Sequence, residues 1–239
     1  MNELASSPSV LSSAARAADE RQRGERVSAR EEVLGRIRTA LGETRAAVPS
    51  VERDYRTAED TPADTPADAE LLALLVDRVE DYRAEVLRCS PAGIGATVRT
   101  ALDRGLGSGW TAEGVVVAPG LPGDWRPDGC DVDDDRPAVQ LADRAAAVTA
   151  VAVAIAETGT LVLDGSPGCG RRALSLLPDC LVCVVTAVQV VRGVPEGIAR
   201  LDPLRPLTMV SGPSATSDIE LERVEGVHGP RTLLVVLAG

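Results

Sequence analysis

The sequence predicts an α/β fold: an open, mostly parallel sheet flanked by helices, with a helical arm before it. Short apolar runs rich in Val, Leu and Ala alternate with segments whose apolar residues recur every three or four positions. The apolar runs contain few polar residues, as in strands that are buried on both faces. The chain has 239 residues, 44% of them apolar, which is enough for one large domain and an arm.

The N-terminal part predicts an arm outside the main core. Residues 1–28 are rich in Ser, Ala, Arg and Glu, which predicts a disordered tail. Across residues 29–42 the large apolar side chains fall on one helical face, so we expect an amphipathic helix that docks on the main domain or on a partner. Residues 43–69 contain the repeat TPADTPAD and predict an extended Pro/Asp-rich linker. The α/β domain is therefore expected to span residues 70–239.

The helix pattern is strongest over Glu70–Arg83, where apolar residues recur at intervals of four, four and three. Either Asp68 or Thr65 is placed to cap its N-terminus. The other predicted elements follow in order: strand Glu85–Cys89, helix Gly93–Arg104, strand Gly114–Ala118, two strands within Val148–Leu163, helix Arg171–Leu177, strand Cys180–Val185, helix Val188–Leu201, strand Leu207–Val210, a short helix from Ser217 and strand Arg231–Leu237.

Charge and residue usage exclude several classes of function. The net charge is −11, which disfavours DNA or RNA because their phosphates need clustered positive charge. The chain has no Lys, which excludes a Schiff-base lysine and a Walker-type phosphate lysine. No apolar run is long enough to span a bilayer, and the N-terminus lacks the apolar core of a signal peptide. We expect a cytoplasmic protein.

Two groups of potential metal ligands have a simpler interpretation. The run Leu121–Asp135 holds six aspartates, but it lacks the spacing of an EF-hand, which favours a solvated loop. Cys180 and Cys183 have metal-ligand spacing but lie in an apolar run that predicts a buried strand, where residues three apart point to opposite faces. We therefore expect buried, inert thiols and no metal site.

The stretch Ser211–Pro230, SGPSATSDIELERVEGVHGP, carries the densest group of polar residues between two apolar runs. Ser217 and Glu220 have the spacing of a capping box, which predicts a short helix. The small residues before it would let a ligand approach the backbone, although acidic residues in the first turn would repel a bare phosphate. A capped helix between two strands also needs no ligand, so the structural interpretation stays open. His228 is the only histidine of the chain.

The segment AETGTLVL predicts a tight turn between two strands, with Gly159 supplying a positive φ. Glu157 in this turn is interpreted in two ways. It is either a carboxylate at a buried edge with a shifted pKa, or an ordinary turn residue.

Four motifs in the same order resemble the LUD domain, the family of lactate-utilisation protein C. They are AETGTLVL at 156–163, LP at 177–178, SGPSATSDIE at 211–220 and GVHGP at 226–230. The resemblance covers about residues 30–239. It implies a fold similar to the sugar-phosphate isomerase and CoA-transferase group. It also implies a role in bacterial lactate oxidation to pyruvate, beside two partner proteins that carry the iron–sulfur clusters, with no cofactor bound directly by this chain.

With the resemblance, the turn and the hydroxyl-rich stretch are expected to face one another across a single cleft. The expected catalytic residues are Glu157, Asp218 and His228, with His228 favoured because histidine titrates near neutrality. A turn histidine bonded to backbone is the competing interpretation. The expected ligand-binding residues, for a small carboxylate or a cofactor, are Thr158, Gly159, Thr160, Ser211, Gly212, Ser214 and Thr216.

Two other functions remain open from the sequence. One is a stand-alone enzyme acting on a phosphorylated or acyl-CoA substrate, which would need arginines at the cleft. The available ones near the motifs are Arg171, Arg172 and Arg231. The other is an assembly subunit without catalysis, in which the arm makes the partner contacts.

Overall fold

The computed structural model describes residues 29–42, 50–52, 54, 65–217, 223–225 and 229–239. The chain divides into two units, Met1–Asp54 and Tyr55–Gly239. In the first unit residues 29–41 form the expected helix, and Val33, Ile37 and Leu41 on it are exposed. None of the helices in the described ranges is long and apolar enough to cross a membrane.

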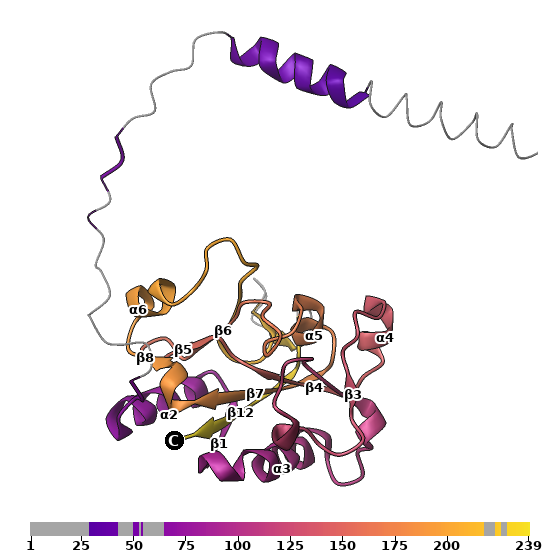
Figure 1. The fold of residues 1–239 in the computed structure, drawn as a ribbon, viewed down its shortest axis with the longest axis vertical. Coiled ribbons are helices and arrows are strands. Elements are labelled where there is room, and N and C mark those ends of the chain that lie inside the picture. The colour runs from indigo at the N-terminus through magenta and orange to yellow at the C-terminus, as the bar shows by residue number, and fades with distance from the viewer. Residues whose placement is uncertain (1–28, 43–49, 53, 55–64, 218–222, 226–228) are drawn as a thin grey trace, which may run out of the picture. The chain divides into compact units, whose positions relative to one another are not determined.

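The second unit is built on a six-stranded sheet in which every pair of neighbours is parallel (Figure 1). The predicted open parallel sheet is confirmed. Its inner strands contain almost only buried Val, Leu, Ala and Cys, which agrees with a sheet that is covered on both faces. The strands, in spatial order, are β1 (Glu85–Cys89), β12 (Thr232–Ala238), β7 (Cys180–Thr186), β4 (Ala146–Ala150), β2 (Val115–Val117) and β3 (Asp131–Val132).

Helices cover this sheet from both sides. In Figure 1, α3 (Ile94–Leu106) lies below the sheet against β7 and β12, and α5 (Arg172–Leu176) lies above it against β4. The helix α2 (Ala69–Asp81) packs on β1 and begins at Asp68, whose carboxylate accepts a hydrogen bond of 2.8 Å from the amide of Leu71. The remaining helical segments are α4 (Ala138–Ala142), α6 (Val194–Ala199) and four 3-10 turns at Pro91–Gly93, Ala112–Gly114, Gly123–Trp125 and Ala187–Gln189.

A second sheet of four strands has the order β8 (Val190–Val191), β5 (Val153–Ile155), β6 (Thr160–Leu163) and β9 (Thr208–Val210). β5 and β6 form the predicted hairpin, with φ of 58° at Gly159. Val148–Leu163 was expected to hold two strands but holds parts of three, because its first residues belong to β4 of the main sheet.

The continuous helix expected over Val188–Leu201 is wrong. Val190 and Val191 instead form β8, which pairs in parallel with β5. The helix α6 starts only after Gly193, whose amide donates to Glu196 Oε2 over 3.0 Å. Pro195 explains the late start, because proline has no amide hydrogen and is tolerated only in the first turn of a helix.

The short helix expected from Ser217 is wrong for the residues that the structure describes, while residues 218–222 of that prediction lie outside them. Ser217 ends strand β10 (Ala215–Ser217), which pairs antiparallel with β11 (Arg223–Glu225). β-branched Thr216 and Val224 lie opposite each other in this pair, and such residues favour strands. The spacing of Ser217 and Glu220 alone therefore does not decide whether Ser217 begins a helix or ends a strand.

Candidate functional site

The ETGT turn and the hydroxyl-rich stretch do meet, through the pairing of β6 with β9. Because Leu161 lies opposite Val210, Thr160 and Ser211 become neighbours at the end of the ladder. Their hydroxyl oxygens are 2.9 Å apart, and the hydroxyl oxygens of Thr158 and Thr160 are 2.8 Å apart. Three of the expected ligand-binding side chains thus form one hydrogen-bonded row, with Thr160 buried in its middle.

The two glycines beside this row pack against the end of α2. Gly159 and Gly212 have φ of 58° and 85°. A Cβ atom on Gly159 would lie 2.9 Å from the carbonyl carbon and oxygen of Arg78, and one on Gly212 would lie 2.7 Å from the carbonyl oxygen of Tyr82. These glycines are therefore needed for helix packing as well as for the backbone conformation. Close approach of a ligand is not required to explain them.

Glu157 lies on the other side of the hairpin. Its amide donates to the carbonyl of Arg192 over 3.0 Å, and its carboxylate lies beside Gly193. The side chain is exposed, which agrees with the interpretation of Glu157 as an ordinary turn residue and not with a carboxylate at a buried edge. Glu157 projects from a four-residue turn, Ala156–Gly159, that holds it outside the core.

The other expected site residues are placed differently or lie outside the described part of the chain. The amide of Ser214 donates to the carbonyl of Pro230 over 2.8 Å, and its side chain lies beside Gly229. Thr216 is in β10, opposite Val224. Asp218 and His228 lie outside the described residues, so their catalytic roles stay predictions.

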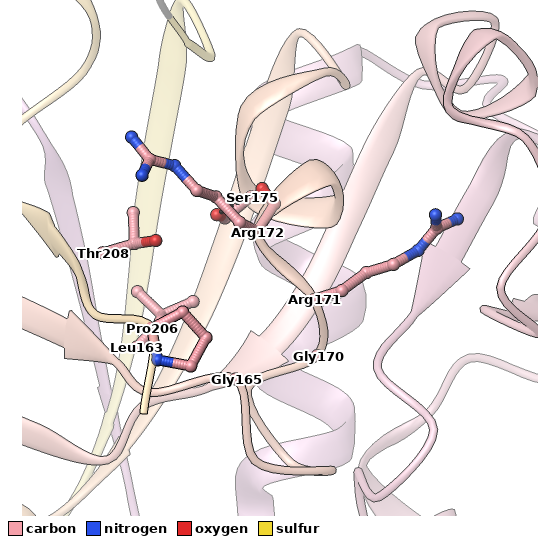
Figure 2. Close-up of a pocket in the computed structure, with 8 residues that line it drawn as sticks. All are labelled: Leu163, Gly165, Gly170, Arg171, Arg172, Ser175, Pro206 and Thr208. Atoms are coloured by element: carbon pink, nitrogen blue, oxygen red, sulfur yellow. Dashed lines mark hydrogen bonds between the residues drawn. The ribbon is translucent and has the colours of Figure 1, made fainter. Parts of the chain in front are cut away.

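A cavity of about 140 Å³ opens at the other end of the β6–β9 pair (Figure 2). It lies between the loop after β6, the start of α5 and the segment entering β9. The carboxyl end of a strand is the common position of a ligand in α/β proteins. The lining residues are Leu163, Gly165, Gly170, Arg171, Arg172, Ser175, Pro206 and Thr208.

The loop between β6 and α5 is held in shape by its own hydrogen bonds. Asp164 Oδ1 accepts from the amide of Ser166 over 3.0 Å, and the amide of Gly170 donates to the carbonyl of Ser166 over 2.8 Å. Burial disfavours the charged form of Asp164, but the hydrogen bonds from Ser166 and Cys169 outweigh it and hold the pKa of this carboxyl below its ordinary value. The carboxylate also lies 3.6 Å from Arg205.

Of the two arginines that line the cavity, Arg171 binds other residues, whereas the Arg172 guanidinium binds none of the described residues. Arg171 donates to both carboxylate oxygens of Asp133, over 2.7 and 2.9 Å, and to the carbonyl of Arg136 over 2.6 Å. Figure 2 shows its guanidinium directed away from the cavity. Arg172 is exposed, its guanidinium has no hydrogen bond or ion pair with any described residue, and its side chain extends toward the side of Thr208 (Figure 2).

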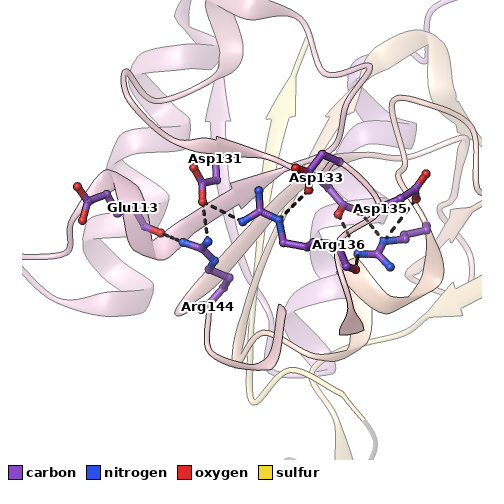
Figure 3. Close-up of polar contacts among 8 residues, drawn as sticks. Glu113, Asp131, Asp133, Asp135, Arg136 and Arg144 are labelled. Atoms are coloured by element: carbon purple, nitrogen blue, oxygen red, sulfur yellow. Dashed lines mark hydrogen bonds and ion pairs between the residues drawn. The ribbon is translucent and has the colours of Figure 1, made fainter. Parts of the chain in front are cut away.

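The acidic run Leu121–Asp135 is not simply the solvated loop that was expected. Figure 3 shows its aspartates interleaved with arginines. Asp131 pairs with Arg136 over 3.1 Å and with Arg144 over 2.6 Å. The Asp133 side chain is 2% exposed. Its hydrogen bonds raise the pKa of Arg171, so the guanidinium stays charged.

Cys180 and Cys183 lie in a buried strand, as the sequence predicts. All five cysteines are free, and Cys180 and Cys183 are buried in β7. Burial raises the pKa of each of these two thiols to about 12. Across the described ranges, the His, Cys, Asp and Glu side chains form no group of three or more that could hold a metal ion.

Comparison with known proteins gives the family. The LUD domain family matches residues 132–238, a range that contains the cavity, the hairpin and the hydroxyl row. A lactate utilization protein C of Deinococcus radiodurans is 47% identical over 178 residues, which is 72% of this chain and 81% of that protein. The chain belongs to the LUD domain family.

Two further LUD-type comparisons agree with this assignment. A lactate utilization protein C of Bacillus subtilis is 28% identical over 232 residues, 84% of this chain and 92% of that protein. A crystal structure described as a DUF162 family protein from Deinococcus radiodurans superimposes with a TM-score of 0.59 at 39% identity, covering 72% of this chain and 98% of that one. The LUD fold seen here, a parallel sheet flanked by helices, is thus shared with a solved relative.

The sequence does not predict the cavity, because its lining comes from three separate segments. It does contain the Gly- and Pro-rich loop Asp164–Gly170, and it places Arg171 and Arg172 directly after this loop. Nothing in the sequence shows which of the two arginines is free. That distinction depends on Asp133, which is 38 positions away from Arg171.

Proposed function

We propose that this LUD-family chain is a non-cluster component of a bacterial lactate-utilisation system, which oxidises L-lactate to pyruvate together with iron–sulfur partner proteins. The main support is the 47% identity to a lactate utilization protein C over 72% of the chain. Other relatives of the same name match 84% or more of the chain at lower identity, which supports involvement in lactate utilisation.

The division of labour between subunits follows from the chemistry. Oxidation of lactate to pyruvate removes an electron pair and two protons from the substrate, and the electrons need an acceptor. The cysteines of this chain are too few and too far apart in sequence for a ferredoxin-type cluster run. In this proposal the partners' clusters accept the electrons, and this chain binds substrate or product or organises the assembly.

The alternative of a stand-alone enzyme on a phosphorylated or acyl-CoA substrate has less support. Pockets for large ligands usually have volumes of roughly 300–1,000 Å³. The cavity measures about 140 Å³, and of the three arginines named for this alternative only Arg172 is unpaired, since Arg171 pairs with Asp133 and Arg231 lies 3.6 Å from Asp179. A single free guanidinium suits a monoanion better than a phosphate ester.

Deletion of the gene in its host tests the proposal. We expect the deletion strain to lose growth on L-lactate and to keep growth on pyruvate, because only the oxidation step is missing. The full-length chain supplied in trans should restore growth. A deletion strain that grows normally on lactate would contradict the proposal.

Affinity purification tests the partners. The tagged full-length chain, isolated under anaerobic conditions, should carry iron and acid-labile sulfide in companion proteins, with the visible absorption of iron–sulfur clusters. The same purification after removal of residues 1–69 tests the assembly role of the arm. Loss of the companions would assign the contact to the arm, and their retention would assign it to the α/β domain.

A further inference from the structure

We propose that the cavity between α5 and the entry to β9 is a binding site for a small monocarboxylate, in which Arg172 holds the carboxylate and Thr208 contacts a neighbouring oxygen of the ligand. The choice of a 2-hydroxy or 2-oxo acid as ligand rests on the proposed function. The site itself rests on the charge, size and shape of the cavity.

The charge of the cavity selects an anion. None of the acidic side chains in the described ranges lines it, although the protein as a whole carries a net charge of −11. The charge of Arg171 is neutralised by Asp133, and the nearby Asp164 carboxylate is held by Ser166 and Arg205. Arg172 therefore supplies an unbalanced positive charge at the mouth of the cavity. Nothing among the described residues competes with a ligand for its guanidinium.

The size of the cavity and the number of its donors select a monocarboxylate. A volume of about 140 Å³ holds a few water molecules, at ~30 Å³ each, or a molecule of a few heavy atoms. A guanidinium binds a carboxylate through two parallel hydrogen bonds, so the two N–H donors of one arginine match the two oxygens of one carboxylate. A phosphate would leave charge unpaired, because Arg172 is the one free cation among the described residues that line the cavity.

The walls fit the rest of such a ligand. Leu163 and Pro206 provide apolar surface for a methyl group. Thr208 lies opposite Leu163 in the β6–β9 ladder, so its position is fixed by backbone pairing. Its half-buried hydroxyl has no hydrogen bond to another described residue and can donate to a hydroxyl or keto oxygen next to the carboxylate.

The position of Arg172 is prepared before any ligand arrives. Its predecessor Arg171 is tied to Asp133 by two hydrogen bonds, and its own carbonyl accepts from Ser175 Oγ over 3.0 Å. The backbone at the start of α5 is thus held from both sides, and only the long side chain of Arg172 needs to be ordered by binding. A prepared site reduces the entropy cost of binding.

Calorimetric titration of the full-length chain tests the site, with L-lactate, pyruvate, acetate and inorganic phosphate as ligands at equal ionic strength. We expect saturable binding of L-lactate or pyruvate with one site per chain. Arg172→Gln should weaken this binding about 10- to 100-fold, the usual effect of losing charge-assisted hydrogen bonds. Arg172→Lys should weaken it less, and Thr208→Val should reduce the preference for L-lactate over acetate.

Arg99→Gln is the matched control, because Arg99 is also exposed on a helix and is not among the residues that line the cavity. Its affinity should equal that of the unaltered chain. Equal melting temperatures for all variants would show that the changes in binding are not caused by unfolding.

Three outcomes would overturn the site: no saturable binding of either acid, tighter binding of phosphate than of both acids, or full affinity in Arg172→Gln. These outcomes are independent of the growth test. If deletion blocks growth on lactate but the chain binds no carboxylate, the site fails and the proposed function stands. If the chain binds the acid but the deletion strain grows normally on lactate, the proposed function fails and the site stands.

Discussion

Arg171 and Asp133 face each other with two hydrogen bonds, of 2.7 and 2.9 Å, although they are 38 positions apart. The carboxylate is almost fully buried, while the guanidinium is 29% exposed. This pair joins the acidic segment beside β3 to the start of α5. It also holds the Arg171 guanidinium away from the cavity (Figure 2), so that Arg172 is the lining arginine with no partner for its guanidinium among the described residues.

We expect Asp133→Ala to lower the free energy of unfolding by about 1–3 kcal/mol, because it leaves a partly buried guanidinium without its partner. Urea denaturation measures this change. Asp135→Asn is the control, since the Asp135 side chain is 95% exposed and lies 3.9 Å from Arg171. Its stability should change by less than about 0.5 kcal/mol. Equal effects of the two substitutions would contradict a structural role for the buried pair.

Gly212→Ala should destabilise the chain more than an alanine at another glycine of similar φ. Gly212 has φ of 85° and would place its Cβ 2.7 Å from the carbonyl oxygen of Tyr82. Gly129 has φ of 76° and would meet only Ala112, at an ordinary 3.5 Å. Positive φ alone costs about 1–2 kcal/mol, and the contact with α2 adds to this at Gly212 only. Thermal melting of both variants gives the comparison, and similar losses would show that the α2 contact is unimportant.

Thr160→Val tests whether the hydroxyl row is structural. The substitution keeps the shape of the buried side chain but removes an oxygen that contacts both Thr158 and Ser211. We expect a loss of about 1–2 kcal/mol of stability. We also expect unchanged affinity for carboxylates, because the cavity lies at the opposite end of the β6–β9 pair. Reduced affinity without reduced stability would instead assign the row to the ligand.

The buried thiols predict a loss of stability at alkaline pH. Burial raises the pKa of Cys180 and Cys183 from an ordinary value of 9.0 to about 12. Between these values the unfolded chain loses the thiol protons and the folded chain keeps them, so the free energy of unfolding falls as pH rises. Each thiol contributes a slope of up to about 1.4 kcal/mol per pH unit in this window.

Urea midpoints measured from pH 8 to pH 10.5 would show this effect. A Cys180→Ala/Cys183→Ala variant should lose stability less steeply above pH 9 than the unaltered chain, because the other titrating groups are common to both. Parallel profiles would mean that the two thiols ionise equally in the folded and unfolded states.

Much of the fold could be read from the sequence, because the strands of the main sheet are buried on both faces and appear as apolar runs. The helix α2 was predictable for a similar reason, since its buried Leu72, Leu75 and Val79 share one face. The segments for which the sequence predicted the wrong structure are short. The strands there are only two and three residues long, at Val190–Val191 and Ala215–Ser217. Their pairing partners lie in other segments, so the local pattern does not distinguish them from helix.

The candidate site was only partly predictable. The family resemblance predicts that the segments of Thr160 and Ser211 lie close together, and in the structure these two side chains are hydrogen-bonded. The sequence did not decide whether Glu157 is buried or exposed, and it did not predict the position of the cavity. Both follow from how β5, β6, β8 and β9 are ordered in the second sheet, which is a property of pairing between distant segments.

By itself, the sequence determined the layered α/β architecture, the family and the burial of Cys180 and Cys183, because each of these depends on residue type and on spacing along the chain. Only the tertiary structure decided which charges are paired and which are free. Asp133 binds Arg171 and not Arg172 although it lies 38 positions away, so that among the described lining residues only Arg172 carries an unbalanced positive charge.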